Sequence, residues 1–323
     1  MRQAWLRKLF IGAGAACMAI SGIAAAAYPD KPIRMIVSFP PGSGTDTTAR
    51  YAARKLEEKI GVPVVVDNRP GGNSFIAVEA VVNAAPDGYT LLLASNSPVA
   101  TNVVMFNELP YDPLKDLAPI AKLAYGPMGL AVKADSPFNT VEDLVDAAKK
   151  NPNDLNYGGG SASYRIATEQ FLSMEGIKAE YIPYKGAAPA LTDLAGGHVD
   201  FVFADLGAAL PFVQGKTMRL LAVTGDKRVP AVPDVPTLKE TGLDNYYMIN
   251  WTAAFAPAGT PQPIIDTLAR HLVDIYQEKE AQDFLDRTSW FAFPDGPAAL
   301  RKFQLSEIKR WGDAAEVAKI PKQ

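Results

Sequence analysis

The chain has 323 residues, of which 48% are hydrophobic, and this is enough apolar material for more than one buried core. Its 32 lysines and arginines face 35 aspartates and glutamates, a mildly acidic balance that argues against a nucleic-acid partner. The single cysteine is Cys17, near the N-terminus, so the fold that follows position 27 must form without disulfides.

The N-terminus has the order of a secretory signal peptide. A basic start over residues 2–8 precedes the apolar run Leu9–Ile23, and the small residues 25–27 follow it. This order predicts a signal peptide over residues 1–27, cleaved before Tyr28, and an exported mature protein. Its removal takes away three basic and no acidic residues, which leaves 29 lysines and arginines against 35 aspartates and glutamates.

Two alternatives to cleavage are a retained membrane anchor and lipidation at Cys17. The apolar run is shorter than the roughly 20 residues that a membrane span needs. Gly14 stands where a lipidated cysteine usually has a large aliphatic residue three positions earlier. Both features favour the cleaved signal.

Strand-like and helical runs alternate through the 296 residues from 28 to 323, which predicts α/β layers and, from the length, two domains. The expected strands are Ile33–Phe39, Val64–Asn68, Thr90–Ser95, Ile120–Leu123, Gly129–Val132, Asn156–Gly158, Ala179–Pro183, Val199–Ala204, Arg219–Thr224 and Trp251–Ala256. The expected helices are Thr47–Ile60, Ser74–Asn83, Thr140–Asn151, Ser163–Glu175, Ala187–Ala195, Leu206–Gln214, Pro263–Gln277, Glu280–Thr288 and Pro297–Val317.

The chain is expected to cross between two lobes twice, near Ala121–Leu130 and near Asn250–Ala256. This predicts one Rossmann-like domain from residues 28–125 together with 252–323, and a second from residues 126–251. Two crossing strands would form a hinge, and the cleft between α/β lobes is a usual place for a ligand.

The turn Phe39–Asp46 joins the first expected strand to the first expected helix through Gly42 and Gly44. Such a turn exposes backbone N–H groups at the positive end of the helix dipole, which suits an anion. It lacks the Lys of a Walker loop and the third glycine of a dinucleotide fingerprint. The alternative is an ordinary turn in which Asp46 is the helix N-cap; Asp46 is also a candidate to orient the turn or to accept from a ligand.

A similar turn recurs at Gly158–Ser163, again between a short strand and a helix. Ser161 and Ser163 offer hydroxyls to the helix N-terminus and to a ligand oxygen. Arg165 follows in the first helical turn, where an arginine is unfavourable for the helix dipole. Its forked donor suits a carboxylate, although a solvated surface arginine is the plainer interpretation.

Polar residues also follow other strands. Ser95-Asn96-Ser97, Tyr184-Lys185-Gly186 and Ala204-Asp205 stand at positions that open onto a cleft when strands end there, although each alone is more often structural than functional. Four aromatic side chains are expected near the cleft, where they either pack in the core or sandwich an aromatic ligand: Phe39, Tyr125, Tyr184 and Phe203.

The sequence holds little catalytic or metal-binding material. Its two histidines, His198 and His271, have no partner at metal-ligand spacing, and no nucleophile elbow, reactive cysteine or carboxylate cluster appears. We therefore expect no metal, no cofactor and no enzyme activity.

Several motifs together resemble the Bug-type receptors, the periplasmic solute-binding proteins of tripartite tricarboxylate transporters. They are Tyr28-Pro-Asp-Lys-Pro-Ile, Phe39-Pro-Pro-Gly-Ser-Gly-Thr-Asp46, Val66-Asp-Asn-Arg-Pro-Gly-Gly72, Ala85-Pro-Asp-Gly-Tyr-Thr90, Tyr184-Lys-Gly-Ala-Ala-Pro-Ala190, Gly215-Lys, Ala222-Val-Thr-Gly225, Pro233-Asp-Val-Pro-Thr237 and Ala256-Pro-Ala-Gly-Thr-Pro261. The likeness covers nearly the whole chain after residue 27.

The resemblance implies a two-lobed clam-shell fold that closes on an organic carboxylate, such as a dicarboxylate or an aromatic acid, held by the loops Pro41–Asp46 and Ser161–Arg165. The ligand-binding residues expected from the turns and the resemblance are Phe39, Pro41, Gly42, Ser43, Gly44, Thr45, Asp46, Ser95, Asn96, Ser97, Ser161, Ser163, Arg165, Tyr184 and Asp205.

Two positions depart from the family's pattern. The family commonly has Gly-Gly where this chain has Gly42-Ser43-Gly44, and often has a histidine where Arg165 stands. Because its guanidinium is permanently charged, we expect Arg165 to favour a ligand with a second carboxylate or a more strongly anionic head.

The resemblance also implies a monomer in the periplasm that delivers its ligand to the membrane subunits of a tripartite tricarboxylate transporter. Two other functions fit the same sequence: a carboxylate-sensing module for a signalling partner, and an exported hydrolase of the same fold. The scarcity of histidine and cysteine argues against the hydrolase.

Overall fold

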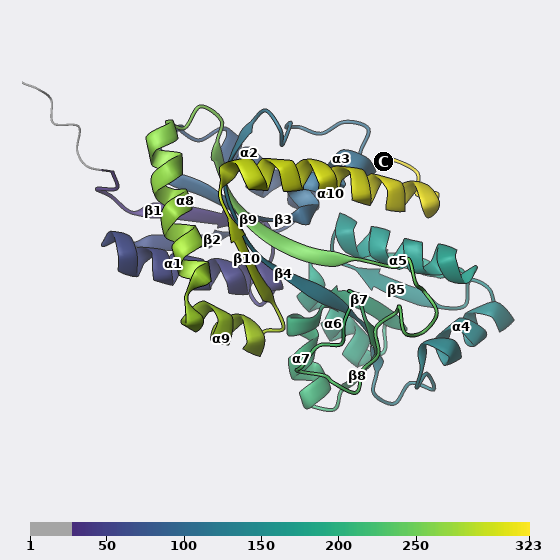
Figure 1. The fold of residues 1–323 in the computed structure, drawn as a ribbon. Coiled ribbons are helices and arrows are strands. Elements are labelled where there is room, and N and C mark those ends of the chain that lie inside the picture. The colour runs from purple at the N-terminus through teal and green to yellow at the C-terminus, as the bar shows by residue number, and fades with distance from the viewer. Residues whose placement is uncertain (1–27) are drawn as a thin grey trace, which may run out of the picture.

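The computed structural model describes residues 28–323, so the predicted signal peptide lies outside the described residues. Two α/β lobes share one curled sheet whose order is β2-β1-β3-β9-β4-β7-β5-β6, with β8 and β10 also paired to β4 (Figure 1). The strands are β1 Ile33–Val37, β2 Val64–Asn68, β3 Thr90–Ser95, β4 Leu117–Lys133, β5 Asn156–Gly159, β6 Glu180–Pro183, β7 Phe201–Asp205, β8 Met218–Val223, β9 Ile249–Pro257 and β10 Phe291–Asp295.

Helices cover both lobes, and we call the part around β1–β3 the first lobe and the part around β5–β8 the second. The α-helices are α1 Gly44–Ile60, α2 Phe75–Val82, α3 Asn102–Met105, α4 Val141–Lys150, α5 Ala162–Glu175, α6 Ala187–Gly196, α7 Leu206–Gln214, α8 Gln262–Gln277, α9 Lys279–Arg287 and α10 Pro297–Val317. Two short turns complete the set, the 3-10 turn η1 Gly72–Ser74 and the π turn η2 Ser97–Thr101.

The first lobe is a sheet between two helical layers. β1 lies between β2 and β3, parallel to both, so its apolar side chains are buried on both faces. Met35 packs in the cluster that contains Leu56 of α1 and Leu272 of α8. Ile36, one position along, packs in the cluster that contains Val78 of α2 and Trp311 of α10.

The second lobe repeats this plan with β5 parallel to β6 and β7. Its core continues the cluster that contains Ile36 and Trp311, so one apolar core passes from lobe to lobe. The long helix α10 crosses the top of the molecule and reaches α5 of the second lobe (Figure 1). There the Ser173 hydroxyl donates to the carbonyl of Val317 at 3.1 Å.

Strand β4 corrects one prediction, because Ile120–Leu123 and Gly129–Val132 are parts of a single strand. The intervening Gly126 and Pro127 do not break it, since β9 pairs with β4 from Leu117 to Pro127, with two register shifts that absorb the irregularity. Antiparallel pairing along the whole crossing was not visible from local composition.

Strands β4 and β9 are the two connections between the lobes. β4 pairs with β10 at Tyr125 and with β7 from Met128, so it changes partners between these residues. The predicted domain limits, 28–125 with 252–323 and 126–251, remain our proposal for where the lobes divide.

Most predicted elements form with ends that differ by one to three residues, and β2, β3, α7 and α10 match their predicted bounds. The prediction missed β10, α3 and the two short turns. Phe291–Asp295 forms a strand only because the edge of β4 is available to pair with it, which its own sequence does not reveal.

Candidate functional site

Helix α1 begins at the turn that the sequence singled out. Gly42 has a φ of +85°, a conformation that favours glycine, and Ser43 is the N-cap, whose hydroxyl accepts from the N–H of Asp46 at 3.2 Å. The prediction of Asp46 as the N-cap is therefore wrong. Its carboxylate instead accepts from the N–H of Gly42 at 3.0 Å and from Nδ2 of Asn68 at 2.8 Å, which fixes the turn.

Helix α5 begins in the same manner in the second lobe. Ser161 is its N-cap, and the Ser161 hydroxyl accepts from the N–H of Tyr164 at 3.4 Å. Gly160, just before it, lies against the backbone of Gly186, where an added Cβ would fall 2.2 Å from the Gly186 carbonyl carbon. The close approach of these two loops explains why glycine is needed at position 160.

Both helix N-termini keep backbone donors available. Within residues 28–323 we find no hydrogen-bond partner for the N–H groups of Thr45 in α1 or of Ala162 and Ser163 in α5. Such groups are the positive ends of helix dipoles and suit an anion.

The lobes touch each other at this site. The N–H of Gly44 in the first lobe donates to Oδ2 of Asp205 in the second at 3.2 Å. The hydroxyls of Ser97 and Ser163, also from opposite lobes, lie 2.7 Å apart. The structure therefore shows the lobes in a closed arrangement.

Asp205 is buried, with 3% of its surface exposed. Burial raises the pKa of its carboxyl above the ordinary value of 3.8, and hydrogen bonds from Asn250, Tyr164 and the Gly44 N–H partly offset that rise. Its two oxygens are committed to protein donors, so Asp205 ties the lobes together at the base of the cleft.

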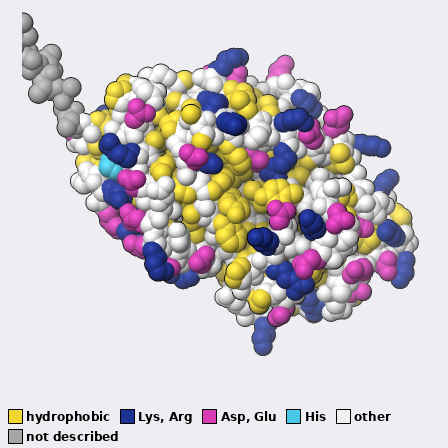
Figure 2. All heavy atoms as spheres, viewed as in Figure 1, with side chains coloured by type: hydrophobic (Ala, Val, Ile, Leu, Met, Phe, Trp, Pro, Cys, Tyr) yellow, Lys and Arg dark blue, Asp and Glu magenta, His cyan; other side chains and the backbone are white. Residues whose placement is uncertain are grey.

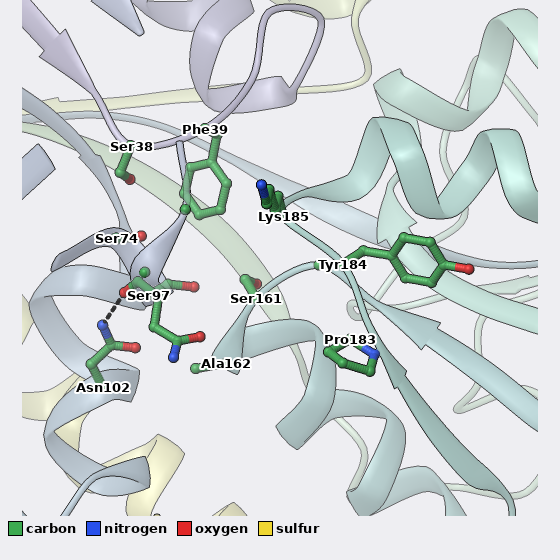
Figure 3. A pocket seen from close by; sticks show the side chains of 14 residues that line it. Ser38, Phe39, Ser74, Ser97, Asn102, Ser161, Ala162, Pro183, Tyr184 and Lys185 are labelled. Carbon is green, nitrogen blue, oxygen red and sulfur yellow. Dashed lines mark hydrogen bonds between the residues drawn. The ribbon is translucent and has the colours of Figure 1, made fainter. Parts of the chain in front are cut away.

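Two neighbouring cavities lie between the lobes. A larger cavity of about 230 Å³ lies where the ends of β1, η1, β6 and the start of α5 meet (Figure 3). A small cavity of about 10 Å³ lies next to it and shares three lining residues with it, Phe39, Ser97 and Ser161. The small cavity is also lined by Ser43, Thr45, Ser95, Tyr164, Ala187, Asp205 and Asn250. The larger one is also lined by Ser38, Gly71, Gly72, Asn73, Ser74, Asn102, Gly160, Ala162, Pro183, Tyr184 and Lys185.

The structure thus brings together eight of the predicted site residues as cavity lining: Phe39, Ser43, Thr45, Ser95, Ser97, Ser161, Tyr184 and Asp205. The other seven do not line either cavity: Pro41, Gly42, Gly44, Asp46, Asn96, Ser163 and Arg165. Some of these contact the lining residues instead: Gly44 is hydrogen-bonded to Asp205, and Ser163 is hydrogen-bonded to Ser97.

Two predicted residues point elsewhere. The guanidinium carbon of Arg165 lies 4.8 Å from the ring centroid of Tyr181, a cation–π contact in the second lobe. The hydroxyl of Tyr184 donates to Asp193 at 2.7 Å, and its ring points away from Phe39 and Ser97 (Figure 3). Whether Arg165 favours a second carboxylate stays a prediction.

The other aromatic side chains that were expected near the cleft, besides Tyr184, lie in three different places. The ring of Phe39 lies at the mouth of the larger cavity (Figure 3). Phe203 is fully buried in the core and stacks on Tyr246. Tyr125 pairs with Phe291 of β10 and lines a different hollow.

The sequence prediction missed the loop Gly71–Ser74, which forms one wall of the larger cavity. Every residue of this loop has a positive φ, from +50° to +105°, so it holds an unusual backbone conformation. The double glycine was a usable signal, since it suggests left-handed backbone. Lys185, an exposed cation that follows Tyr184 directly, also lines this cavity; the sequence placed it at the mouth of the cleft, but it was not among the expected ligand-binding residues.

Within residues 28–323 there is no group of three or more His, Cys, Asp and Glu side chains arranged to hold a metal ion. In the same range, no helix is both long enough and apolar enough to cross a membrane.

A two-lobed α/β fold, crossed by two strands and closed over polar cavities, defines the class of periplasmic binding proteins. The family model described as "Tripartite tricarboxylate transporter family receptor" matches residues 48–318. The chain therefore belongs to this family, whose members are solute-binding receptors and not enzymes, and it is of the Bug type.

Individual relatives agree with this membership. Protein BugT of Bordetella pertussis is 37% identical over 306 residues, which cover 91% of this chain and 92% of that protein. The solved structure of R. palustris Rpa4515 with adipate is 32% identical with a TM-score of 0.89, covering 92% of this chain and all of that one. MatC from Rhodopseudomonas palustris, with bound malate, is 26% identical with a TM-score of 0.83, covering 89% and 99%.

Proposed function

We propose that this chain is a periplasmic receptor that captures a small organic dicarboxylate between its lobes and delivers it to the membrane subunits of a tripartite tricarboxylate transporter. The observation that carries this proposal is the convergence of two helix N-termini, α1 and α5, from opposite lobes on one polar space. An anion there would contact both lobes at once.

One carboxylate would be held by the backbone donors of Thr45 and Ala162, which line the two cavities, with the hydroxyls of Ser43 and Ser161 as helix caps behind them. A hydrogen bond from an N–H group to a charged acceptor contributes about 1.5–3 kcal/mol. Because the donors belong to both lobes, the ligand stabilises the closed arrangement over the open one, and this difference shifts the population towards closure.

The larger cavity supports a second acidic group on the ligand. Its volume of about 230 Å³ suits a small molecule, and Lys185 contributes an ammonium to a lining that contains no Asp or Glu. Two solved relatives hold adipate and malate, both of which are dicarboxylates. Lys185 is therefore our candidate for the group that meets the distal carboxylate.

We propose the location and the partners of this chain from its membership of the same family. The predicted signal peptide would export the chain, and transporter receptors of this kind act by presenting a closed, loaded form to membrane subunits. We propose that the mature protein acts as a monomer, since each chain holds both halves of the site.

The proposal is tested by thermal denaturation of the mature chain, residues 28–323, with adipate, malate, hexanoate and benzoate. Adipamide serves as the matched neutral control. We expect saturable stabilisation by a dicarboxylate and none by adipamide, with about 2.7 kcal/mol gained at 100 times the dissociation constant. Equal stabilisation by adipamide, or none by any acid, would contradict a carboxylate site.

Delivery is tested separately by transport into vesicles that contain the membrane subunits. Uptake of the bound acid should require the loaded receptor. Binding without any uptake would favour the sensing module over the transport receptor.

A further inference from the structure

A third hollow, of about 510 Å³, lies where β4 and β9 cross between the lobes. Its walls include Tyr125 and Pro127 of β4, Ile249 of β9, Phe291 of β10, Tyr247 and the loop over residues 224–230. We call it the hinge pocket. The strands β4, β9 and β10 face the viewer in Figure 1, and Figure 2 shows apolar side chains gathered over them, with basic and acidic side chains around the edge.

The hinge pocket and the carboxylate cleft lie on opposite faces of the same two strands. Gly126 of β4 packs against Trp290, and Asn250 of β9 donates to Asp205, so both belong to the cleft side. Their neighbours along the strands, Pro127 and Ile249, line the hinge pocket. Successive residues of a strand face opposite sides, which explains this separation.

The chemistry of the hinge pocket suits an aromatic acid. Three aromatic side chains, Tyr125, Tyr247 and Phe291, supply flat apolar surface, and the volume lies within the range of small-molecule sites. The polar part of the wall carries two cations, Lys227 and Arg228, against one carboxylate, Asp226.

The two cations are not equivalent. Arg228 donates to both carboxylate oxygens of Glu240 at 3.0 Å and to the carbonyl of Pro233 at 3.1 Å. Lys227 has no ion-pair partner among residues 28–323. Its ammonium is therefore the group that an acidic substituent on a ligand would meet.

We propose that the hinge pocket is a second ligand site, which binds a planar aromatic ring that carries an acidic group. Rings of the pocket contact the ring of the ligand, and Lys227 pairs with its acidic group. Binding there does not require a ligand in the cleft.

Occupancy of the hinge pocket favours the closed arrangement. Tyr125 and Phe291 belong to the first-lobe side, whereas the loop over residues 224–230 is fixed to the second by hydrogen bonds between Thr224 and Met128. Rotation of the lobes about β4 and β9 changes the spacing of these walls. A ligand that fits the pocket as it stands in the closed molecule therefore stabilises closure.

The test uses 1-anilinonaphthalene-8-sulfonate, an aromatic sulfonate that fluoresces in apolar sites, titrated into the mature chain. We expect one site, weakened about fivefold by Tyr247→Ala and by Lys227→Glu. The matched controls Leu305→Ala and Lys178→Glu change an exposed apolar and an exposed basic residue elsewhere and should leave binding unchanged. Circular dichroism of each variant verifies that it is folded.

Three results would overturn the proposal. The first is the absence of binding, the second is equal binding by pocket and control variants, and the third is a loss in the cleft variant Ser97→Ala, which would place the dye in the cleft. Tighter binding of proflavine, a planar aromatic cation, would overturn the assignment of an acidic ligand.

The coupling to closure rests on the proposed function, since it needs a cleft ligand. With the dye saturating, the dicarboxylate found by thermal denaturation should bind more tightly, and unchanged or weaker binding would overturn the coupling. If no dicarboxylate binds, the proposed function fails, while the dye titration still decides the hinge pocket.

Discussion

The backbone N–H of Gly44 in the first lobe donates to the carboxylate of Asp205 in the second, across 161 positions of sequence. This bond places a buried acidic group of the protein at the N-terminus of α1, beside the cavity that we assign to the ligand. The Gly44 N–H is thus used for the contact between the closed lobes, whereas the neighbouring N–H groups of the helix stay available to bind the ligand.

Gly44→Ala tests how closely the lobes must approach. A Cβ at position 44 would lie 2.6 Å from both Oδ2 of Asp205 and Cζ2 of Trp290, so the lobes must move apart. Such overpacking costs about 1–3 kcal/mol, and we expect dicarboxylate binding to weaken by about tenfold or more in calorimetric titration. The control is Gly312→Ala in α10, where the nearest atom is 3.8 Å away. Equal affinities for both variants would contradict the closure contact.

The buried carboxyl of Asp205 gives stability a defined pH dependence. Because its native pKa lies above the unfolded value of 3.8, the native state binds more protons between the two values. Its contribution to the free energy of unfolding therefore falls as the pH rises through that interval. The asparagine of Asp205→Asn cannot titrate. In urea denaturation, the free energy of unfolding of this variant should therefore rise relative to that of the parent protein from about pH 4 upwards. A difference that stays constant with pH would refute this.

Lys185 and Arg165 are competing candidates for the distal carboxylate of the ligand. Lys185 lines the larger cavity, whereas Arg165 lies over the ring of Tyr181. We expect Lys185→Ala to weaken adipate binding by about fivefold while hexanoate binding is unchanged, because an exposed ion pair is worth about 1 kcal/mol. Arg165→Ala should change neither ligand's affinity. The opposite pattern in calorimetric titrations would restore Arg165 as the selecting residue.

Substitution of Glu307 in α10 is expected to lower the stability of the protein, because this residue has a purely structural role. Its buried carboxylate accepts from Nε1 of Trp251 at 2.8 Å and from Nε1 of Trp311 at 3.2 Å, and it pairs with Arg310 at 2.6 Å. Glu307→Ala leaves these donors without an acceptor, so urea denaturation should show a loss of about 3 kcal/mol. The exposed pair of Lys309 and Asp313 is the control, where Asp313→Ala should cost about 0.5 kcal/mol or less. Similar losses in both variants would show that burial does not matter here.

The local sequence predicted the helix starts and strand positions well, because those features depend on nearby residues. The glycine turn before α1 and its repeat before α5 are visible in the sequence, since glycine and serine at these places supply the backbone freedom and the caps. The identity of the cap was wrong by three positions, because Asp46 had better partners in Gly42 and in the distant Asn68.

The sequence predicted part of the site, and the predicted residues that do not line a cavity share a physical cause. Arg165 and Ser163 of α5 are close in sequence to residues that line the cavities, yet the Arg165 guanidinium lies over the ring of Tyr181 and the Ser163 hydroxyl bonds to Ser97. Whether a helical side chain faces a cavity or a neighbour depends on packing partners that are remote along the chain.

By itself, then, the sequence determined the alternation of strands and helices, the two anion-binding turns and the family, since each rests on short motifs with a local physical cause. Only the tertiary structure decided that β4 is one continuous strand, that Asp205 closes on Gly44, and that a pocket lies behind the hinge. Those features depend on pairing and contacts between lobes, where residues more than a hundred positions apart meet.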